Sequence, residues 1–197
     1  MHGDLAGVLL SVSLIGVCTG VSCFFRGELK RKIVHIGVSN FAFIYLYVFE
    51  SDLMPVLGLC AFAVINLAVA VKQKSRRYGT VLFPISVVIL ITAKSLGFGT
   101  ARDVACATLA MGWGDGLAAL VGMCAGKTKM PLCDKKTVVG SFTVFACVML
   151  CIVFVGGKSP LQALAVSVIA VLAEAYTPYG LDNVSVPAVV FTGCALI

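Results

Sequence analysis

Charged residues are scarce in this sequence. Asp, Glu, Lys and Arg make up 12% of the 197 residues, whereas about 25% is usual for a soluble domain. Apolar residues reach 60% and the mean hydropathy is +1.05, which excludes an ordinary soluble domain. The apolar residues form long blocks separated by short polar joints, and not the alternating segments of about ten residues that mark a β-barrel. This pattern indicates a multi-span helical membrane protein.

Histidine is scarce too, and the cysteines are not arranged in metal-binding pairs. The two histidines are His2 and His35, and the nine cysteines include no C-x-x-C pair. This composition argues against a zinc site, and we interpret the cysteines as small apolar filler. The first apolar run has no basic segment before it, so we interpret it as a retained span and not as a signal peptide.

Hydropathy divides the chain into apolar spans. We expect one integral membrane domain over residues 1–197, folded as an all-α polytopic transmembrane bundle of seven to eight spans. The expected spans lie near 5–25, 33–50, 53–71, 80–97, 103–125, 141–157, 160–176 and 184–197. The last span is short, so a re-entrant or tilted C-terminal segment also fits.

The basic residues predict the orientation. Twelve of the fifteen Lys and Arg residues lie in three alternate joints: Arg26, Lys30, Arg31 and Lys32; Lys72, Lys74, Arg76 and Arg77; Lys127, Lys129, Lys135 and Lys136. Cytoplasmic loops carry an excess of Lys and Arg. We therefore expect the N-terminus outside and these joints in the cytoplasm. Because the cations are confined to joints, the net charge of +6 does not indicate a nucleic-acid partner.

A carboxylate interrupts the apolar segment near 103–125, at Asp115 between Gly114 and Gly116. A charge inside a membrane span is costly without a cation or metal, so its presence favours a functional role. Asp115 follows Arg102 by 13 residues, about 20 Å along a helix, which places it in the cytoplasmic half of the membrane. A Mg²⁺ ligand or a general base would fit this position.

Small residues recur every four positions in the same segment, at Gly114, Ala118, Gly122 and Gly126. Such a stripe allows two helices to pack closely in a membrane. Packing accounts for the stripe, but it does not account for the carboxylate beside it.

Two further motifs on the cytoplasmic side suit phosphate groups. Lys136 and Thr137 are followed by Gly140 and Ser141 at the start of an apolar span, where backbone N–H groups and an ammonium could cradle phosphates. A topology signal with an ordinary Ser cap is the alternative. His35 follows Arg31 and Lys32 by one helical turn, and it fits a packed residue or a functional one equally well.

Two more carboxylates lie near the C-terminus. Glu174 follows Pro160 by 14 residues, about 21 Å along a helix, and therefore reaches a depth similar to that of Asp115. Asp182 and Asn183 alone would be a turn, but a loop does not explain Glu174. Three carboxylates near many cations are what a metal–nucleotide site requires.

These motifs resemble, in order, those of the polyprenol kinase family, which contains dolichol kinases, phytol and farnesol kinases and CTP-dependent diacylglycerol kinases, and which is related to phosphatidate cytidylyltransferases. The resemblance covers roughly residues 26–190, where we place the catalytic region. It implies phosphoryl transfer from a nucleoside triphosphate, usually CTP, to a lipid alcohol. Dolichol and diacylglycerol kinases often have an acidic residue where Val139 stands, which leaves a phytol-kinase-like or another lipid kinase open.

The resulting hypothesis is a kinase that acts at the cytoplasmic face on an isoprenoid alcohol or diacylglycerol. The expected catalytic residues are Asp115, His35 and Asp182, and the expected Mg²⁺ ligands are Asp115, Asp182 and Glu174. The expected nucleotide-binding residues are Lys136, Thr137, Gly140, Ser141, Arg31, Lys32, Gly114, Gly116 and Asn183.

Two other functions remain open at this point. A cytidylyltransferase would use the same residues to join CTP to a lipid phosphate. A small transporter would use Asp115 and Glu174 as ion-coupling sites, although no inverted repeat is evident and the charges gather on one face. A purely structural membrane protein would leave the carboxylates without a purpose.

Overall fold

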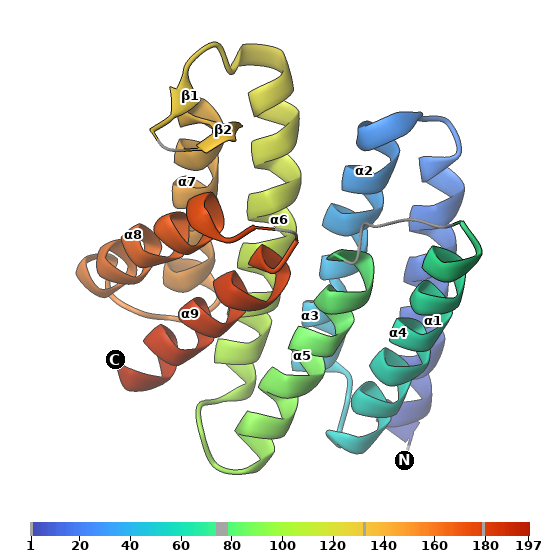
Figure 1. Ribbon diagram of the computed structural model, residues 1–197. Coiled ribbons are helices and arrows are strands. Elements are labelled where there is room, and N and C mark those ends of the chain that lie inside the picture. Colours follow the sequence, from blue (N-terminus) through green and yellow to red (C-terminus); the bar gives the residue numbers. More distant parts are fainter. Residues whose placement is uncertain (1, 74–78, 132, 179) are drawn as a thin grey trace.

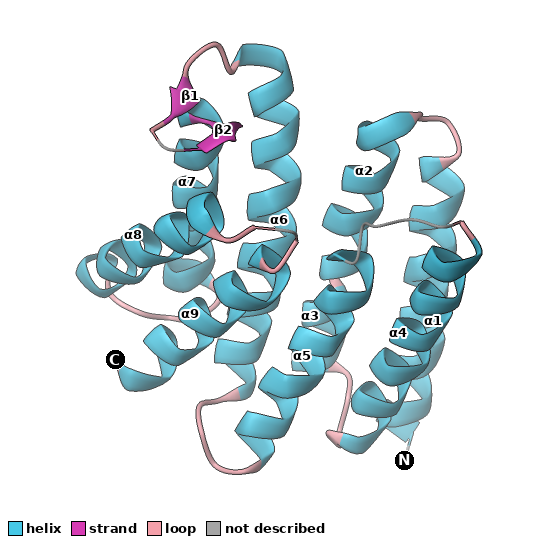
Figure 2. Ribbon diagram, in the orientation of Figure 1, coloured by secondary structure: helices cyan, strands magenta, loops and turns pink. Residues whose placement is uncertain are grey.

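Helices dominate the structure, which is a computed structural model describing residues 2–73, 79–131, 133–178 and 180–197 (Figures 1 and 2). The helices are α1 (His2–Ser22), α2 (Gly27–Ser39), α3 (Phe41–Tyr47), α4 (Leu53–Lys72), α5 (Gly79–Ser95), α6 (Ala101–Ala125), α7 (Val138–Phe154), α8 (Pro160–Tyr176) and α9 (Asp182–Leu196). A short antiparallel hairpin of β1 (Lys129–Met130) and β2 (Cys133–Thr137) links α6 to α7. The all-α class is confirmed, and the hairpin is an addition that hydropathy did not indicate.

Three of the described helices, α1, α4 and α6, are long and apolar enough to cross a membrane. Four shorter apolar helices, α5, α7, α8 and α9, have 15 to 17 residues, or about 22–26 Å, against a hydrocarbon core of about 30 Å. The connections after α1 and α6 lie at one end of the bundle, and those after α3 and α5 lie at the other (Figure 1). Two of the basic joints are therefore at the same end.

The expected span 33–50 consists of two helices, α2 and α3, which meet at Asn40. The Asn40 side-chain amide donates to the carbonyls of Ile36 (2.9 Å) and Gly37 (3.0 Å), and such local bonds compete with the regular helix ladder. The expectation that Arg31 and Lys32 lie in a loop is wrong. Gly27 turns the chain with φ +61°, so that α2 begins before these residues and carries both.

Helix α6 lies at the centre of the bundle, and its glycines permit close contacts on two sides. A Cβ atom at Gly116 would lie 2.2 Å from Ile36 Cγ1, and one at Gly112 would lie 2.1 Å from Ser39 Cβ, so these glycines face α2. Gly114 faces Val144 of α7, and Gly122 faces Thr137 at the start of α7. The stripe of small residues therefore packs against α7, as predicted.

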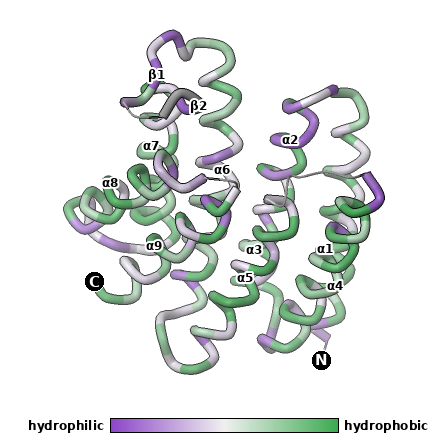
Figure 3. Tube along the Cα trace, viewed as in Figure 1, coloured by the Kyte–Doolittle hydropathy of each residue, from purple (hydrophilic) through white to green (hydrophobic). Residues whose placement is uncertain are grey.

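The start of α7 is held by Thr137 and not by a serine. Thr137 Oγ1 accepts a hydrogen bond of 3.1 Å from the backbone N–H of Gly140, which is the usual geometry of a helix N-cap. The hairpin before it is tied to α8, because Tyr176 donates from its hydroxyl to the carbonyl of Pro131 (3.2 Å). Hydrophilic residues gather on α2 and at the hairpin, whereas most helices are hydrophobic along their length (Figure 3).

Candidate active site

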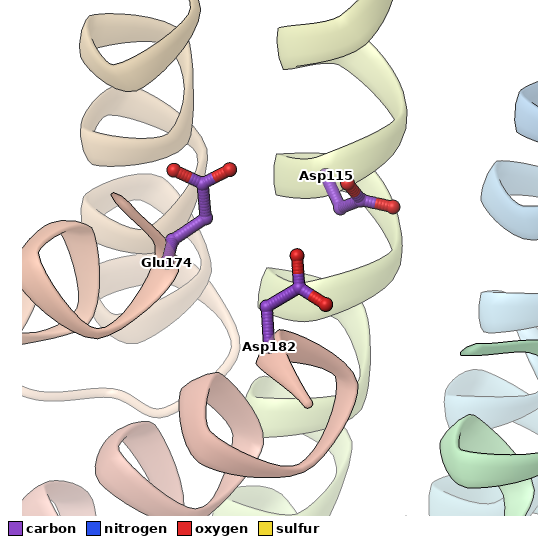
Figure 4. Close-up of side chains that lie close together, drawn as sticks. All are labelled: Asp115, Glu174 and Asp182. Atoms are coloured by element: carbon purple, nitrogen blue, oxygen red, sulfur yellow. The ribbon is translucent and has the colours of Figure 1, made fainter. Parts of the chain in front are cut away.

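Three carboxylates from three helices meet inside the bundle. Asp115 lies in α6, Glu174 in the last turn of α8, and Asp182 at the first residue of α9, and one oxygen atom of each lies within 4.8 Å of the others. Figure 4 shows the Asp182 carboxylate directed toward the space between the other two. Glu174 and Asp182 are buried and the Asp115 side chain is 12% exposed, so this charge requires cations nearby.

Two lysines compensate the carboxylates. Lys32 of α2 donates to Asp115 Oδ2 over 2.6 Å. Lys136, the penultimate residue of β2, pairs with Glu174 and lies 3.3 Å from Asp182 Oδ2. Burial lowers the pKa of Lys136, but the charges of Glu174 and Asp182 outweigh it and raise this pKa above the ordinary lysine value. The Lys136 ammonium is therefore charged throughout the neutral range.

The turn before α9 positions Asp182 and its neighbour. Gly180 has φ +81°, a conformation that glycine adopts without strain, and a Cβ atom there would meet the backbone of Gly79 at 3.4 Å. Asp182 Oδ1 accepts from the Asn183 backbone N–H (3.0 Å) and side-chain amide (3.2 Å). The negative charge of Asp182 also lies at a helix N-terminus, where the helix dipole stabilises it.

A cavity of about 710 Å³ contains this cluster. Its lining includes most of the predicted site residues: Arg31, Lys32, Asp115, Lys136, Thr137, Gly140, Ser141, Glu174, Asp182 and Asn183. Three predicted residues are not part of its lining: Gly114 and Gly116 face neighbouring helices, and His35 lines a second cavity.

Several buried polar atoms in the large cavity have no hydrogen-bond partner among the described residues. They are Ser141 Oγ, Glu174 Oε2 and Asn183 Oδ1. An unsatisfied buried polar group costs about 1–3 kcal/mol, and each such group in a native protein calls for an explanation. A polar ligand in the cavity would supply the missing partners.

The oxygen donors suit a hard divalent cation. Asp115, Glu174 and Asp182 each offer a carboxylate oxygen. Asn183 lines the same cavity, and its amide oxygen has no partner among the described residues. Carboxylates and water are ligands of both Mg²⁺ and Ca²⁺; Ca²⁺ also takes amide oxygens, and Mg²⁺ also takes substrate phosphates. The residues present therefore fit a divalent cation, with water or phosphate completing its shell.

His35 connects the cluster to a second cavity of about 300 Å³. Its Nε2 atom lies 3.7 Å from Asp115 Oδ2 and is buried without a hydrogen-bond partner among the described residues. The ring packs edge-on against Phe83, with centroids 4.6 Å apart. One side of the His35 ring is thus packed against an aromatic residue, and its Nε2 atom is available to accept a hydrogen bond or a proton.

Two charged lining residues, Glu28 and Lys129, were not predicted as site residues. Glu28 Oε1 accepts a hydrogen bond from Arg31 Nε (3.1 Å), and Lys129 lies in β1. The three-residue spacing of Glu28 and Arg31 is a signal for a helical ion pair, and it applies here because α2 begins at Gly27. Lys129 carried no signal beyond its charge, because its place depends on the hairpin.

The fold and the cavity define a helical membrane protein with a strongly charged site enclosed between its helices. The chain is 28% identical to a phytol kinase from Synechocystis sp. in an alignment of 186 residues; the match covers 86% of this chain and 78% of that kinase. Together with the order of the motifs, this similarity supports membership of the chain in the polyprenol kinase family of lipid-alcohol kinases. No family model matches the chain, and no solved structure matches it.

Proposed function

We propose that this protein transfers the γ-phosphoryl group of a nucleoside triphosphate to the hydroxyl of an isoprenoid alcohol at the cytoplasmic side of a membrane. The observation that carries the proposal is the arrangement of three carboxylates and several cations around one cavity of about 710 Å³. Phosphoryl transfer needs mainly positioning and charge stabilisation, and these residues supply both. The similarity to a phytol kinase supports an alcohol as the acceptor.

The triphosphate binds where the cations and the start of α7 converge. Lys136 and Arg31 line the cavity and attract phosphate oxygens, and the free hydroxyl of Ser141 donates to one of them. The family resemblance favours CTP as the donor. Lys136 is already charged at neutral pH, because its carboxylate partners raise its pKa.

A magnesium ion would be held by Asp115, Glu174 and Asp182, with Asn183 as a further oxygen donor. When bound, the ion would neutralise part of the charge that develops on the β- and γ-phosphates. Lys136 now contacts two of these carboxylates, so it can turn toward phosphate oxygens when a cation takes its place.

At the γ-phosphorus, the reaction forms one P–O bond and breaks one. The alcohol oxygen bonds to the γ-phosphorus as the bond from that phosphorus to the β,γ-bridging oxygen breaks, and the nucleoside diphosphate leaves. The hydroxyl proton passes to His35 Nε2, which has no other partner among the described residues. Asp115 lies 3.7 Å from this nitrogen and stabilises the imidazolium that forms, while Lys32 holds the carboxylate in place.

Purified protein, Mg²⁺, γ-labelled CTP or ATP and a panel of phytol, polyprenol and diacylglycerol test the proposal. We expect labelled lipid phosphate and nucleoside diphosphate, and about a hundredfold or greater loss in Asp115→Asn. If a lipid phosphate is supplied in place of the alcohol, an unlabelled CDP-lipid with release of labelled pyrophosphate from CTP would identify a cytidylyltransferase instead. Ion-coupled uptake by liposomes with no nucleotide consumed would identify a transporter. Full activity in His35→Gln would remove the proton-transfer role from His35 and leave it to Asp115.

A further inference from the structure

Two smaller cavities continue from the charged one into the apolar part of the bundle. The second cavity, of about 300 Å³, shares Arg31, Gly79 and Asn183 with the charged cavity. A third cavity, of about 100 Å³, shares Val38, Phe62 and Phe83 with the second. The three cavities therefore form a row, and His35 lies in the middle one.

The walls of the row change from charged to apolar. The third cavity lies between α1, α3, α4 and α5, and it is lined mainly by aliphatic and aromatic side chains. Its two hydroxyl groups are satisfied by their own helices, because Ser11 donates to the carbonyl of Gly7 and Thr108 donates to that of Val104. The third cavity, which is the apolar end of the row, therefore offers no free hydrogen-bonding side chain among its described residues and suits a hydrocarbon.

The apolar end also opens toward the membrane. Gly58 of α4 and Val12 of α1 line the third cavity and are exposed. Of the three long apolar helices described, α1 and α4 are less buried than α6. A Cβ atom at Gly58 would meet nothing within 4 Å. A chain could thus enter from the bilayer between α1 and α4 at Gly58, where no side chain of the described residues stands in its way.

We propose that this row of cavities binds the single hydrocarbon tail of the alcohol substrate, with its hydroxyl at His35 and its far end beside Gly58. The inference rests on the proposed kinase function for the identity of the polar end. From Asn66 to Met54, the lining of α4 extends about 18 Å at the rise of a helix. A narrow path of this length fits one slender isoprenoid or alkyl chain better than the two chains of diacylglycerol.

Substitution at Gly58 tests the path by kinetics. Gly58→Leu places a side chain in the open rim, and we expect the ratio of kcat/KM for phytol to that for prenol, a single isoprene unit, to fall by about tenfold or more. Gly16→Leu is the matched control. Gly16 is an exposed glycine of α1, and a Cβ atom there would have nothing within 4 Å. It does not line the row of cavities. An unchanged ratio in Gly58→Leu, or an equal fall in Gly16→Leu, would overturn the proposal, as would a preference for diacylglycerol over phytol.

Photo-crosslinking tests the same path without catalysis. A long-chain isoprenoid alcohol with a diazirine at the far end of its tail should label α1, α4 or α5 of the full-length wild-type protein in nanodiscs, and excess phytol should compete while phospholipid does not. Labelling of α7 or α8 instead would show that the tail does not lie in this row of cavities. Competition by phospholipid and not by phytol would show that the row holds an ordinary membrane lipid. Either result would overturn the proposal. If labelling is as expected but no phosphate is transferred, the kinase proposal fails and the tail site stands.

Discussion

The Lys32 ammonium donates a hydrogen bond of 2.6 Å to Asp115 Oδ2, and this bond joins α2 to α6 across 83 positions of the chain. The side chains are only 4% and 12% exposed. A buried ion pair adds little stability compared with apolar residues of similar size, whereas removal of one partner is costly. The function of this pair is therefore to keep a carboxylate charged and oriented inside the helix bundle.

Removal of either partner of this pair should destabilise the protein, and removal of both should not. Asp115→Asn or Lys32→Met should each cost about 3–5 kcal/mol, because an unpaired charge remains buried. Lys32→Met/Asp115→Leu should recover most of that loss, while kinase activity remains absent. Thermal unfolding and phosphate transfer, measured on all four proteins, check this. Activity in the double variant would contradict the role of Asp115.

Divalent cations should stabilise the protein through the three carboxylates. A ligand that binds only the folded state raises the free energy of unfolding by about 2.7 kcal/mol at one hundred times its Kd. We expect Mg²⁺ to raise Tm in the wild type, and Asp182→Asn to weaken this response strongly. Asp52→Asn is the control, because Asp52 pairs with Lys94 away from the cavity. An equal Mg²⁺ response in wild type and Asp182→Asn would exclude this metal site.

The buried hydroxyl of Ser141 should matter for nucleotide binding and not for folding. Since Ser141 Oγ has no hydrogen-bond partner among the described residues, Ser141→Ala should leave Tm unchanged or raise it slightly. Loss of a hydrogen bond to a charged phosphate should raise the nucleotide KM by roughly 10–100-fold, which corresponds to about 1.5–3 kcal/mol. Ser167→Ala is matched, because Ser167 Oγ is also buried and unpartnered but lies outside the cavity lining. A similar KM increase in both variants would contradict the prediction.

The charge of Lys136 should support stability until strongly alkaline pH. The pKa of Lys136 is raised in the folded protein, because Glu174 and Asp182 outweigh burial, so its contribution is complete below the unfolded value of about 10.4 and is lost as pH rises through the folded pKa. Lys136→Met should therefore be less stable than the wild type at neutral pH, and the difference should narrow only above about pH 10. Denaturant unfolding at several pH values measures this, and a gap that closes near neutral pH would refute it.

Gly116 should be intolerant of a methyl group, and Gly114 should accept one. An added Cβ at Gly116 would lie 2.2 Å from Ile36 Cγ1, whereas at Gly114 the nearest contact is 3.7 Å. Overpacking costs about 1–3 kcal/mol, so Gly116→Ala should lower Tm clearly and Gly114→Ala should not. Ile36→Ala should restore Gly116→Ala, since it removes the atoms that clash and leaves Cβ at 3.6 Å. Failure of this rescue would show that the glycine serves a purpose other than helix contact.

Much of the fold follows from hydropathy, which can be summed residue by residue along the chain. Apart from α2 and α3, apolar runs predicted the bounds of the described helices to within about three residues, and the span 160–176 coincides with α8. The helix break at Asn40 and the early start of α2 at Gly27 were missed, because they depend on side-chain hydrogen bonds and a positive φ that hydropathy does not register. The hairpin was missed for a similar reason, since its pairing is a backbone property.

By itself, the sequence determined the membrane class and identified the charged residues that cannot lie in lipid without partners. The order of its motifs also indicated a resemblance to a kinase family. Only the tertiary structure decided which of those residues meet. Asp115, Glu174 and Asp182 come together because the last turn of α8 and the first residue of α9 lie close to Asp115 of α6. Lys32 reaches Asp115 because Gly112 and Gly116 let α2 approach α6. The free-energy cost of burying a charged residue can be estimated from that residue alone. The partner that offsets this cost depends on how the helices pack, and no local sequence pattern specifies that packing.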